Sequence, residues 1–83
     1  MRNRRFFVLD PKSFRALGRR SRRRRQALLL NVTTVARELN LSPHEFEKFE
    51  SGRLSLTSSQ LTSLSQILRT TENELTQGLV ASQ

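Results

Sequence analysis

Apolar residues between positions 35 and 50 recur at helical intervals that are interrupted once, at a short turn. Val35 and Leu39 are four residues apart, and Phe46 and Phe49 are three apart, so each pair lies on one face of a helix. Leu41 falls between the two pairs, where it fills the corner between two crossing helices. This pattern predicts two short helices joined by a tight turn, which is the helix-turn-helix geometry.

Two further residues fit that geometry for steric reasons. Ala36 has only a methyl group, which suits a site where two helices cross closely. Asn40 lies in the turn, and Asn tolerates the positive φ that such a turn needs better than most residues. The alternative is an ordinary corner in a small helical bundle, which needs neither a small residue nor a left-handed turn residue.

Helix starts are marked by a repeated arrangement. A capping residue is preceded by an apolar residue and followed, four positions later, by another, as in a hydrophobic staple. The four sets are Leu9, Asp10 and Phe14; Leu30, Asn31 and Val35; Leu41, Ser42 and Phe46; and Leu56, Thr57 and Leu61. Capping boxes and a fifth start are marked by Ser42 with Glu45, Thr57 with Gln60, and Thr71 with Glu74.

Together these signals predict an all-α fold. The five expected helices span about residues 11–28, 32–39, 43–51, 58–68 and 72–79. Gly52 is expected to end the third helix, because glycine accepts the left-handed conformation of a helix C-terminus. The expected organisation is a basic N-terminal arm over residues 1–9, one domain over residues 10–80 and a C-terminal tail over residues 81–83.

The net charge of +8 is concentrated near the N-terminus. Residues 1–30 carry ten arginines and Lys12 against Asp10 alone, a local charge of +10, whereas residues 31–83 carry four basic and six acidic side chains. Such a concentration of one sign attracts polyanions strongly. Nucleic acid is therefore the expected partner.

Composition also excludes several classes of function. The absence of cysteine excludes disulfides and thiolate metal sites, and it fits a reducing cytoplasm, which is the expected location. No apolar run approaches the roughly 20 residues that cross a bilayer. His44 is the single histidine, and there is no Gly-rich phosphate loop. We therefore expect no enzymatic activity, no cofactor, no metal and no membrane partner.

Over about residues 14–76, the sequence resembles the Cro and repressor class of DNA-binding domains, of the xenobiotic-response-element type. The motifs that carry the resemblance are Leu17-Gly18-Arg19-Arg20, Val35-Ala36, Leu39-Asn40-Leu41-Ser42, Phe49-Glu50-Ser51-Gly52 and the Leu61, Leu64 and Leu68 stripe. The resemblance implies a compact five-helix, lambda-repressor-like bundle in which the third helix is the recognition helix. It also implies a partly buried ion pair between Arg25 and Glu50.

The same resemblance implies roles at double-stranded DNA. The residues that would face base edges are Pro43, His44, Glu47 and Lys48. The residues that would hold phosphates from helix and loop ends are Asn31, Ser51, Arg53 and Ser55. Lys48 can donate to guanine, Glu47 can accept from cytosine N4, and His44 can do either. An exposed histidine without a role in recognition is the alternative for His44.

The arginines add candidate phosphate contacts on the basis of charge. In the run over residues 19–25 these are Arg19, Arg20, Arg22 and Arg23, and in the arm they are Arg2, Arg4 and Arg5. The arm would follow a phosphate strand or enter a minor groove. The alternatives are a solvated helix face for the run and an unbound tail for the arm.

Three features depart from the family pattern. Val32 stands where the family usually has a glutamine that contacts phosphate and base, so that contact is lost or moved. Ser21 replaces a buried aliphatic residue, so the first helix packs less tightly or the hydroxyl bonds back to a carbonyl. Glu45 and Glu47 bring carboxylates to a helix that would face phosphates, where each must meet a donor or point away. Attachment would then depend on the arginines.

The leading hypothesis is a small bacterial or phage transcriptional regulator, a repressor or an autoregulatory controller, that binds an inverted-repeat operator as a homodimer. The dimer interface is expected at the fifth helix, where a small domain covers side chains poorly: Leu75, Leu79 and Val80. Two alternatives are RNA binding through the arginine-rich first helix and a protein-interaction module that uses the same fold.

Overall fold

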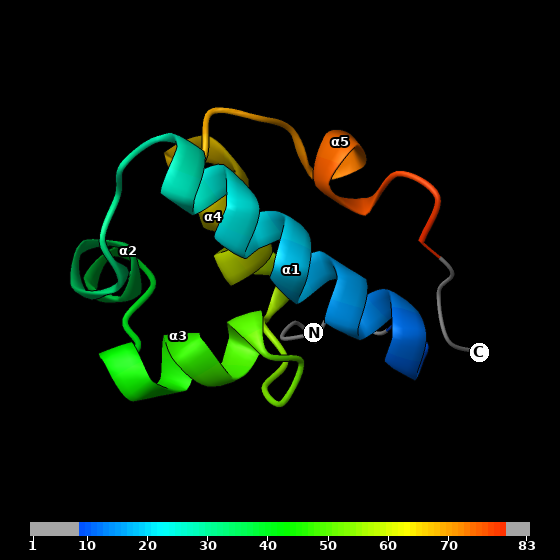
Figure 1. Ribbon diagram of the computed structural model, residues 1–83, viewed down its shortest axis with the longest axis horizontal. Coiled ribbons are helices and arrows are strands. Elements are labelled where there is room, and N and C mark those ends of the chain that lie inside the picture. The colour runs from blue at the N-terminus through cyan, green and yellow to red at the C-terminus, as the bar shows by residue number, and fades with distance from the viewer. Residues whose placement is uncertain (1–8, 80–83) are drawn as a thin grey trace, which may run out of the picture.

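The computed structural model describes residues 9–79, which contain five helices and no β-strand. The helices are α1 (Pro11–Ala27), α2 (Val32–Glu38), α3 (Pro43–Glu50), α4 (Ser58–Ile67) and α5 (Glu72–Thr76). Figure 1 shows them gathered into one compact bundle. The predicted all-α fold with five helices is therefore confirmed.

Each of the five helices begins at its predicted capping residue. The side-chain oxygen of that residue accepts a hydrogen bond from the backbone N–H three positions on, in Asp10, Asn31, Ser42, Thr57 and Thr71. The two predicted capping boxes are complete, because the Ser42 N–H donates to Glu45 Oε1 and the Thr57 N–H donates to Gln60 Oε1, both at 2.9 Å. Local hydrogen bonds therefore fix where every helix starts.

The first four helices end in the same way. At the end of α3, the Gly52 N–H donates to the Phe49 carbonyl at 3.0 Å and the Arg53 N–H donates to the Lys48 carbonyl at 2.7 Å, with Gly52 at φ 81°. This pair of bonds is a Schellman motif. The left-handed residues in the other three motifs are Leu29 (φ 59°), Asn40 (φ 60°) and Arg69 (φ 57°). The roles of Asn40 and Gly52 were predicted, whereas those of Leu29 and Arg69 were not.

The fifth helix is shorter than predicted. It ends at Thr76 and not at residue 79, because Gln77 has an extended ψ of 128° and Gly78 has a φ of 78°. Gly78 takes this left-handed conformation without the steric penalty that a Cβ would bring. Leu79 therefore follows the helix and does not extend its apolar face.

The core lies where the helices meet. α1 packs against α3 on one side and against α5 on another, α2 packs against α3 and α4, and α4 packs against α5. The buried apolar residues are Leu17, Val35, Ala36, Leu39, Phe46, Phe49, Leu56, Leu61, Leu64, Leu68 and Leu75. The ring centroids of Phe46 and Phe49 lie 5.7 Å apart. The predicted helix-turn-helix pattern is confirmed, since all of its paired apolar residues are in this core.

Two residues of α1 determine how closely it packs. A Cβ at Gly18 would lie 2.5 Å from the Glu50 carbonyl oxygen and 2.6 Å from that of Phe49, so only glycine allows this approach of α1 to α3. Ser21 is fully buried, and its hydroxyl has no hydrogen-bond partner among the described residues. Of the two alternatives for Ser21, the hydrogen bond from its hydroxyl back to a carbonyl is therefore not formed within the described residues.

Candidate nucleic-acid interface

α3 is tied to α1 by a bidentate ion pair. Arg25 Nε lies 2.7 Å from Glu50 Oε2, and Arg25 Nη2 lies 3.1 Å from Glu50 Oε1. Arg25 Nη1 also donates to the Leu30 carbonyl oxygen at 3.0 Å. The two charged side chains are only 11% and 6% exposed. The ion pair implied by the family resemblance is present, and it fixes the orientation of α3 and of the chain that enters α2.

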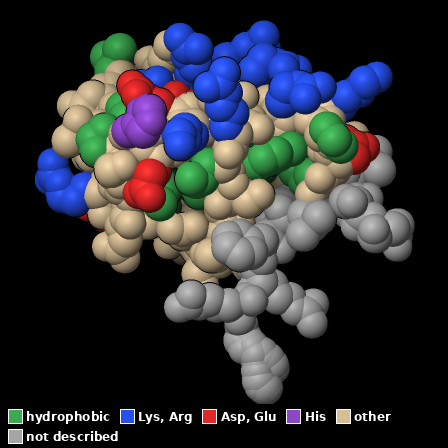
Figure 2. Space-filling view, turned by 90° about the horizontal axis from the view of Figure 1, so that it is seen from below, with side chains coloured by type: hydrophobic (Ala, Val, Ile, Leu, Met, Phe, Trp, Pro, Cys, Tyr) green, Lys and Arg blue, Asp and Glu red, His purple; other side chains and the backbone are tan. Residues whose placement is uncertain are grey.

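The side of α3 that faces away from the core is polar and open. Phe46, Phe49 and Glu50 point inward, and at 100° per residue the opposite side of the helix belongs to His44 and Lys48. Both of these side chains are exposed. Figure 2 shows the histidine on an uncovered surface with basic and acidic side chains around it. His44 and Lys48 are therefore available to a partner that faces α3.

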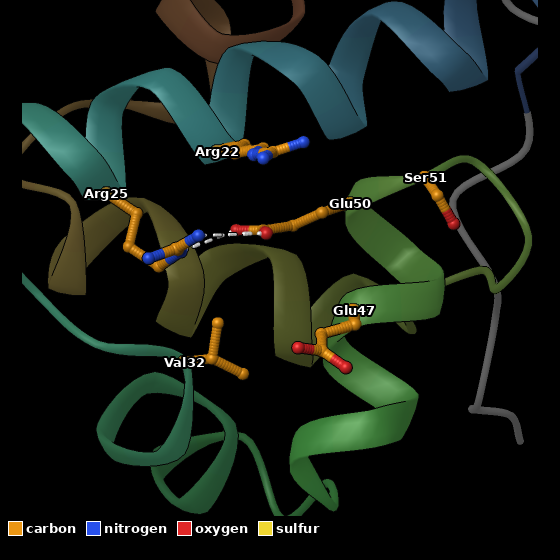
Figure 3. A pocket seen from close by; sticks show the side chains of 6 residues that line it. All are labelled: Arg22, Arg25, Val32, Glu47, Glu50 and Ser51. Atoms are coloured by element: carbon orange, nitrogen blue, oxygen red, sulfur yellow. Dashed lines mark hydrogen bonds and ion pairs between the residues drawn. The ribbon is translucent and has the colours of Figure 1, made fainter.

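A hollow of about 280 Å³ lies beside the ion pair. Its lining residues come from α1, α2 and α3 and the turn after α3: Arg22, Arg25, Val32, Glu47, Glu50 and Ser51. Figure 3 shows Glu47 on the side of α3 that borders this hollow. The predicted base-reading residues are thus divided, because His44 and Lys48 face outward while Glu47 lies toward α1 and α2. Pro43, the fourth of them, is exposed at the first position of α3.

Two of the departures from the family pattern concern this region. Val32 lines the hollow and is half-buried, and its side chain brings no hydrogen-bond donor there. Glu45 is exposed, but its carboxylate accepts the Ser42 N–H and so belongs to the cap of α3. Of the two exposed carboxylates of α3, Glu45 and Glu47, only that of Glu47 therefore lines the hollow.

Some arginines of the run over residues 19–25 bind other parts of the chain, and others face solvent. Arg20 Nη1 donates to two carbonyl oxygens in and just after α5, at 2.9 and 2.8 Å. Arg24 donates through Nε and Nη2 to two carbonyl oxygens at the end of α4, at 2.8 and 2.9 Å. The four acceptors belong to Leu75, Gln77, Leu68 and Arg69. Because helix ends leave carbonyls unpaired and partly negative, a guanidinium caps them well. Arg20, a predicted phosphate ligand, is thus engaged within the chain through Nη1, and its contact with phosphate stays a prediction.

A row of exposed cations runs along α1. We call it the α1 stripe, and it consists of Lys12, Arg15, Arg19 and Arg22. Spacings of three and four residues place these side chains on one face of the helix. Within residues 9–79 none of them makes a hydrogen bond or an ion pair. Figure 2 shows basic side chains along one edge of the face that carries the histidine.

Two residues of the stripe lie beside α3 or the turn that follows it. Arg22 lines the hollow, and Arg15 lies against Gly52 at the end of α3, where an added Cβ would come within 2.6 Å of Arg15 Cγ. Arg15 was not among the predicted site residues. Its position four residues before Arg19 places both side chains on one face of a helix, so the sequence contained the signal for it. Arg23 is also exposed and unpaired within the described range.

The other predicted phosphate ligands lie at helix ends and loops. Asn31 is exposed, and its side chain caps α2 by accepting the Thr34 N–H at 2.8 Å. Ser51 is exposed, but its hydroxyl donates to the Lys48 carbonyl at 3.0 Å. Two further exposed candidates are Arg53 and Ser55. Three others, Arg2, Arg4 and Arg5, lie outside the described residues.

The predicted dimer interface needs a correction. Leu75 is only 5% exposed, because it packs into the core of its own chain. Leu79 is half-buried against the same core, and Val80 lies outside the described residues. The expectation that helix five leaves its apolar side chains poorly covered is therefore wrong for Leu75.

No further candidate chemistry is found in the described part of the chain. Residues 9–79 bring no three His, Asp or Glu side chains together where a metal ion would bind. Nor does any helix in this range have the length and hydrophobicity needed to cross a membrane. What these residues do present is a helix with an open polar side, α3, next to the cations of the α1 stripe.

Comparison with known proteins identifies the family of this arrangement. Residues 16–77 match the family model described as a helix-turn-helix domain. The chain belongs to this family. The helix-turn-helix domain is also 36% identical, over 52 residues, to a Rhodospirillum rubrum protein named "uncharacterized transcriptional regulator in ATPase CF(0) region". The aligned part covers 63% of this chain and 48% of that protein, so the chain spans about half the length of this relative.

The comparisons leave the narrower class open. No solved structure matches the chain. The resemblance to the Cro and repressor class therefore stays a prediction within the helix-turn-helix family.

Proposed function

We propose that this helix-turn-helix domain is a small transcriptional regulator that binds double-stranded DNA at specific sequences, with α3 in the major groove. The observation that carries the proposal is the outer side of α3, where His44 and Lys48 are exposed while Phe46, Phe49 and Glu50 hold the inner side. The major groove is about 12 Å wide and admits one helix. Lys48 would donate to guanine O6 or N7, and His44 would contact a neighbouring base edge. The family match and the name of the relative support this role.

Attachment to the phosphate backbone would come from the α1 stripe. Lys12 and Arg22 are ten residues apart, which is about 15 Å along a helix. One DNA strand carries a phosphate about every 3.4 Å of helix axis, so the stripe spans about four phosphates. Further phosphate ligands in this proposal are Arg23, Asn31, Ser51, Arg53 and Ser55. The same stripe borders α3, so one duplex would contact both surfaces.

We infer that two copies bind an inverted repeat, with one copy on each half-site. Half-sites on one face of DNA lie about 34 Å apart, and the domain measures 34 × 28 × 22 Å. Neighbouring copies would therefore touch if their longest dimension followed the DNA axis. Because Leu75 is buried, we propose that contact between copies involves Leu79 and Val80, the second of which lies outside the described residues. Repression or autoregulation by such a homodimer remains part of the proposal.

The proposal is tested by gel shift with DNA from upstream of the protein's own gene, against a scrambled duplex as competitor. Lys48→Glu is expected to abolish the preference for the natural sequence, because it replaces a base-facing donor by an acceptor. The matched control is Arg69→Glu, in the α4–α5 turn on the side of the bundle opposite α3 (Figure 1). This control is expected to keep the preference. Equal affinity of the wild-type protein for both duplexes would contradict the proposal.

Salt dependence tests the backbone contacts separately. If about six phosphates are neutralised, affinity falls about a thousandfold between 50 and 200 mM salt. A flat response would contradict attachment through the α1 stripe. Preferential binding of structured RNA in the same assay would favour the RNA alternative, which has lost support because Arg20, Arg24 and Arg25 are engaged within the chain.

A further inference from the structure

The recognition helix carries two exposed carboxylates, but only one of them has a partner. Glu45 accepts a hydrogen bond from the Ser42 N–H at 2.9 Å, so its charge is part of the cap of α3. Glu47 makes no hydrogen bond or ion pair with any residue in the described range 9–79. Its charge is therefore available to whatever approaches α3.

Glu47 lies beside a cation of the α1 stripe, because it lines the same hollow as Arg22. It lines the hollow between α1, α2 and α3 (Figure 3). Arg25, one of the two cations of the hollow, is already paired with Glu50. A phosphate that approaches the hollow thus meets one unpaired cation, Arg22, and one unpaired anion, Glu47.

We propose that Glu47 is a specificity-determining residue that acts by repulsion. On DNA of arbitrary sequence, its carboxylate would lie near phosphates without a donor and would weaken attachment. On the operator, a base with an N–H donor within reach would offset that repulsion. This inference rests on the proposed function, since it assumes that α3 enters the major groove.

The hydrogen-bonding groups on the edges of the bases indicate which base Glu47 would select. A carboxylate accepts hydrogen bonds and donates none, and the donors in the major groove are cytosine N4 and adenine N6. The N6 donor of adenine lies next to its N7 acceptor, which repels a carboxylate, whereas cytosine has no acceptor on this edge. The operator half-site is therefore expected to contain a cytosine opposite Glu47.

The first arm of the test measures binding to scrambled DNA at about 50 mM salt. Glu47→Gln keeps the shape of the side chain and removes its charge. The matched control is Glu38→Gln, which removes the same charge from the exposed C-terminal end of α2, on the side that faces α4. Glu47→Gln is expected to bind the scrambled duplex about fivefold more tightly than Glu38→Gln does. Circular dichroism and thermal melts verify that both variants are folded.

The second arm selects binding sites from a random duplex library. The wild-type protein is expected to enrich one invariant cytosine in each half-site, and Glu47→Gln is expected to lose that preference. Equal affinities of the two folded variants for scrambled DNA would overturn the repulsion, and an unchanged cytosine preference in Glu47→Gln would overturn its role in selection. If the wild-type protein enriches no sequence, the proposed function fails and the cytosine preference fails with it, while the first arm still decides whether Glu47 repels DNA.

Discussion

Replacement of Ser21 by alanine is expected to stabilise this domain, although it removes a polar group from the middle of a helix. Ser21 lies on the buried side of α1 with an exposed fraction of 0%, and its hydroxyl has no hydrogen-bond partner among the described residues. In the unfolded chain the same hydroxyl is bonded to water. Folding therefore removes hydrogen bonds with water and replaces them with none.

The magnitude follows from three contributions. A buried hydroxyl without a partner costs about 1–3 kcal/mol, which alanine avoids. Alanine is also the better helix former, by about 0.5 kcal/mol. The space left by one oxygen atom costs under about 1 kcal/mol in lost contacts. The free energy of unfolding of Ser21→Ala is thus expected to rise by about 1–3 kcal/mol, which raises the Tm of a domain this small by about 4–24 °C.

Ser65→Ala provides the matched control. Ser65 is also a buried serine within a helix, at 4% exposure in α4, but its hydroxyl donates to the Thr62 carbonyl at 2.7 Å. The gain in helix propensity is the same at both sites, so it cancels in the comparison. Because Ser65→Ala also loses a hydrogen bond, its free energy of unfolding should stay level or fall by up to about 1 kcal/mol.

Urea unfolding followed by far-UV circular dichroism measures both variants. An unchanged m-value together with a higher midpoint would show that the native state of Ser21→Ala is stabilised. Equal changes in Ser21→Ala and Ser65→Ala would refute the reasoning, since the missing hydrogen bond of Ser21 would then have no energetic consequence. A destabilised Ser21→Ala would refute it more strongly.

Three further predictions concern packing and pH. Gly18→Ala should lower the free energy of unfolding by about 1–3 kcal/mol, because its Cβ would lie 2.5 Å from the Glu50 carbonyl oxygen; urea unfolding measures this, and an unchanged midpoint would contradict the close approach. Glu50→Gln should cost about 3 kcal/mol, because it leaves the nearly buried Arg25 without its counter-ion; a loss below about 1 kcal/mol would mean that solvent replaces the pair. The hydrogen bond from the Thr70 hydroxyl lowers the pKa of Glu74 below 4.5, so the stability it contributes is complete above that pH and is lost as the pH falls through the lowered pKa. NMR titration should show this pKa returning toward 4.5 in Thr70→Val, and an identical titration curve in both proteins would exclude the hydrogen bond as the cause.

The starts of the helices could be predicted from the sequence because capping is local. Each cap joins residues three positions apart, so its signal is complete within a short stretch of chain. The ends were only partly predictable. Asn40 and Gly52 are residue types that favour positive φ, but Leu29 and Arg69 adopt it against a penalty of about 1 kcal/mol. The paired backbone hydrogen bonds of the Schellman motifs accompany that conformation, and neither residue type signals it in the sequence.

In the candidate site, too, the features that local sequence determines could be predicted and the features that depend on packing could not. The spacing of Phe46 and Phe49 identifies the inner side of α3, and from it follows the outward direction of His44 and Lys48. The position of Glu47 beside the hollow depends on how α1 and α2 pack around α3, which the sequence of α3 does not contain. The partners of Arg20 were beyond sequence reasoning for a related reason, since they lie 55 and 57 residues further along the chain.

These distant partners change the interpretation of the arginine run. Seven consecutive residues of a helix point in all directions around its axis, so a purely solvated face cannot hold them all. In the structure the residues of the run have different surroundings. Arg25 pairs with α3, Arg24 caps α4 and Arg20 caps the end of α5. Ser21 lies in the core, and the residues that face solvent are Arg19, Arg22 and Arg23. Loss of nucleic-acid binding on replacing the whole run would therefore not identify phosphate contacts, because the ends of α4 and α5 would lose their caps at the same time. Replacing only the three solvent-facing arginines of the run would test binding to phosphate without removing a helix cap. These three arginines account for less than half of the net charge of +8.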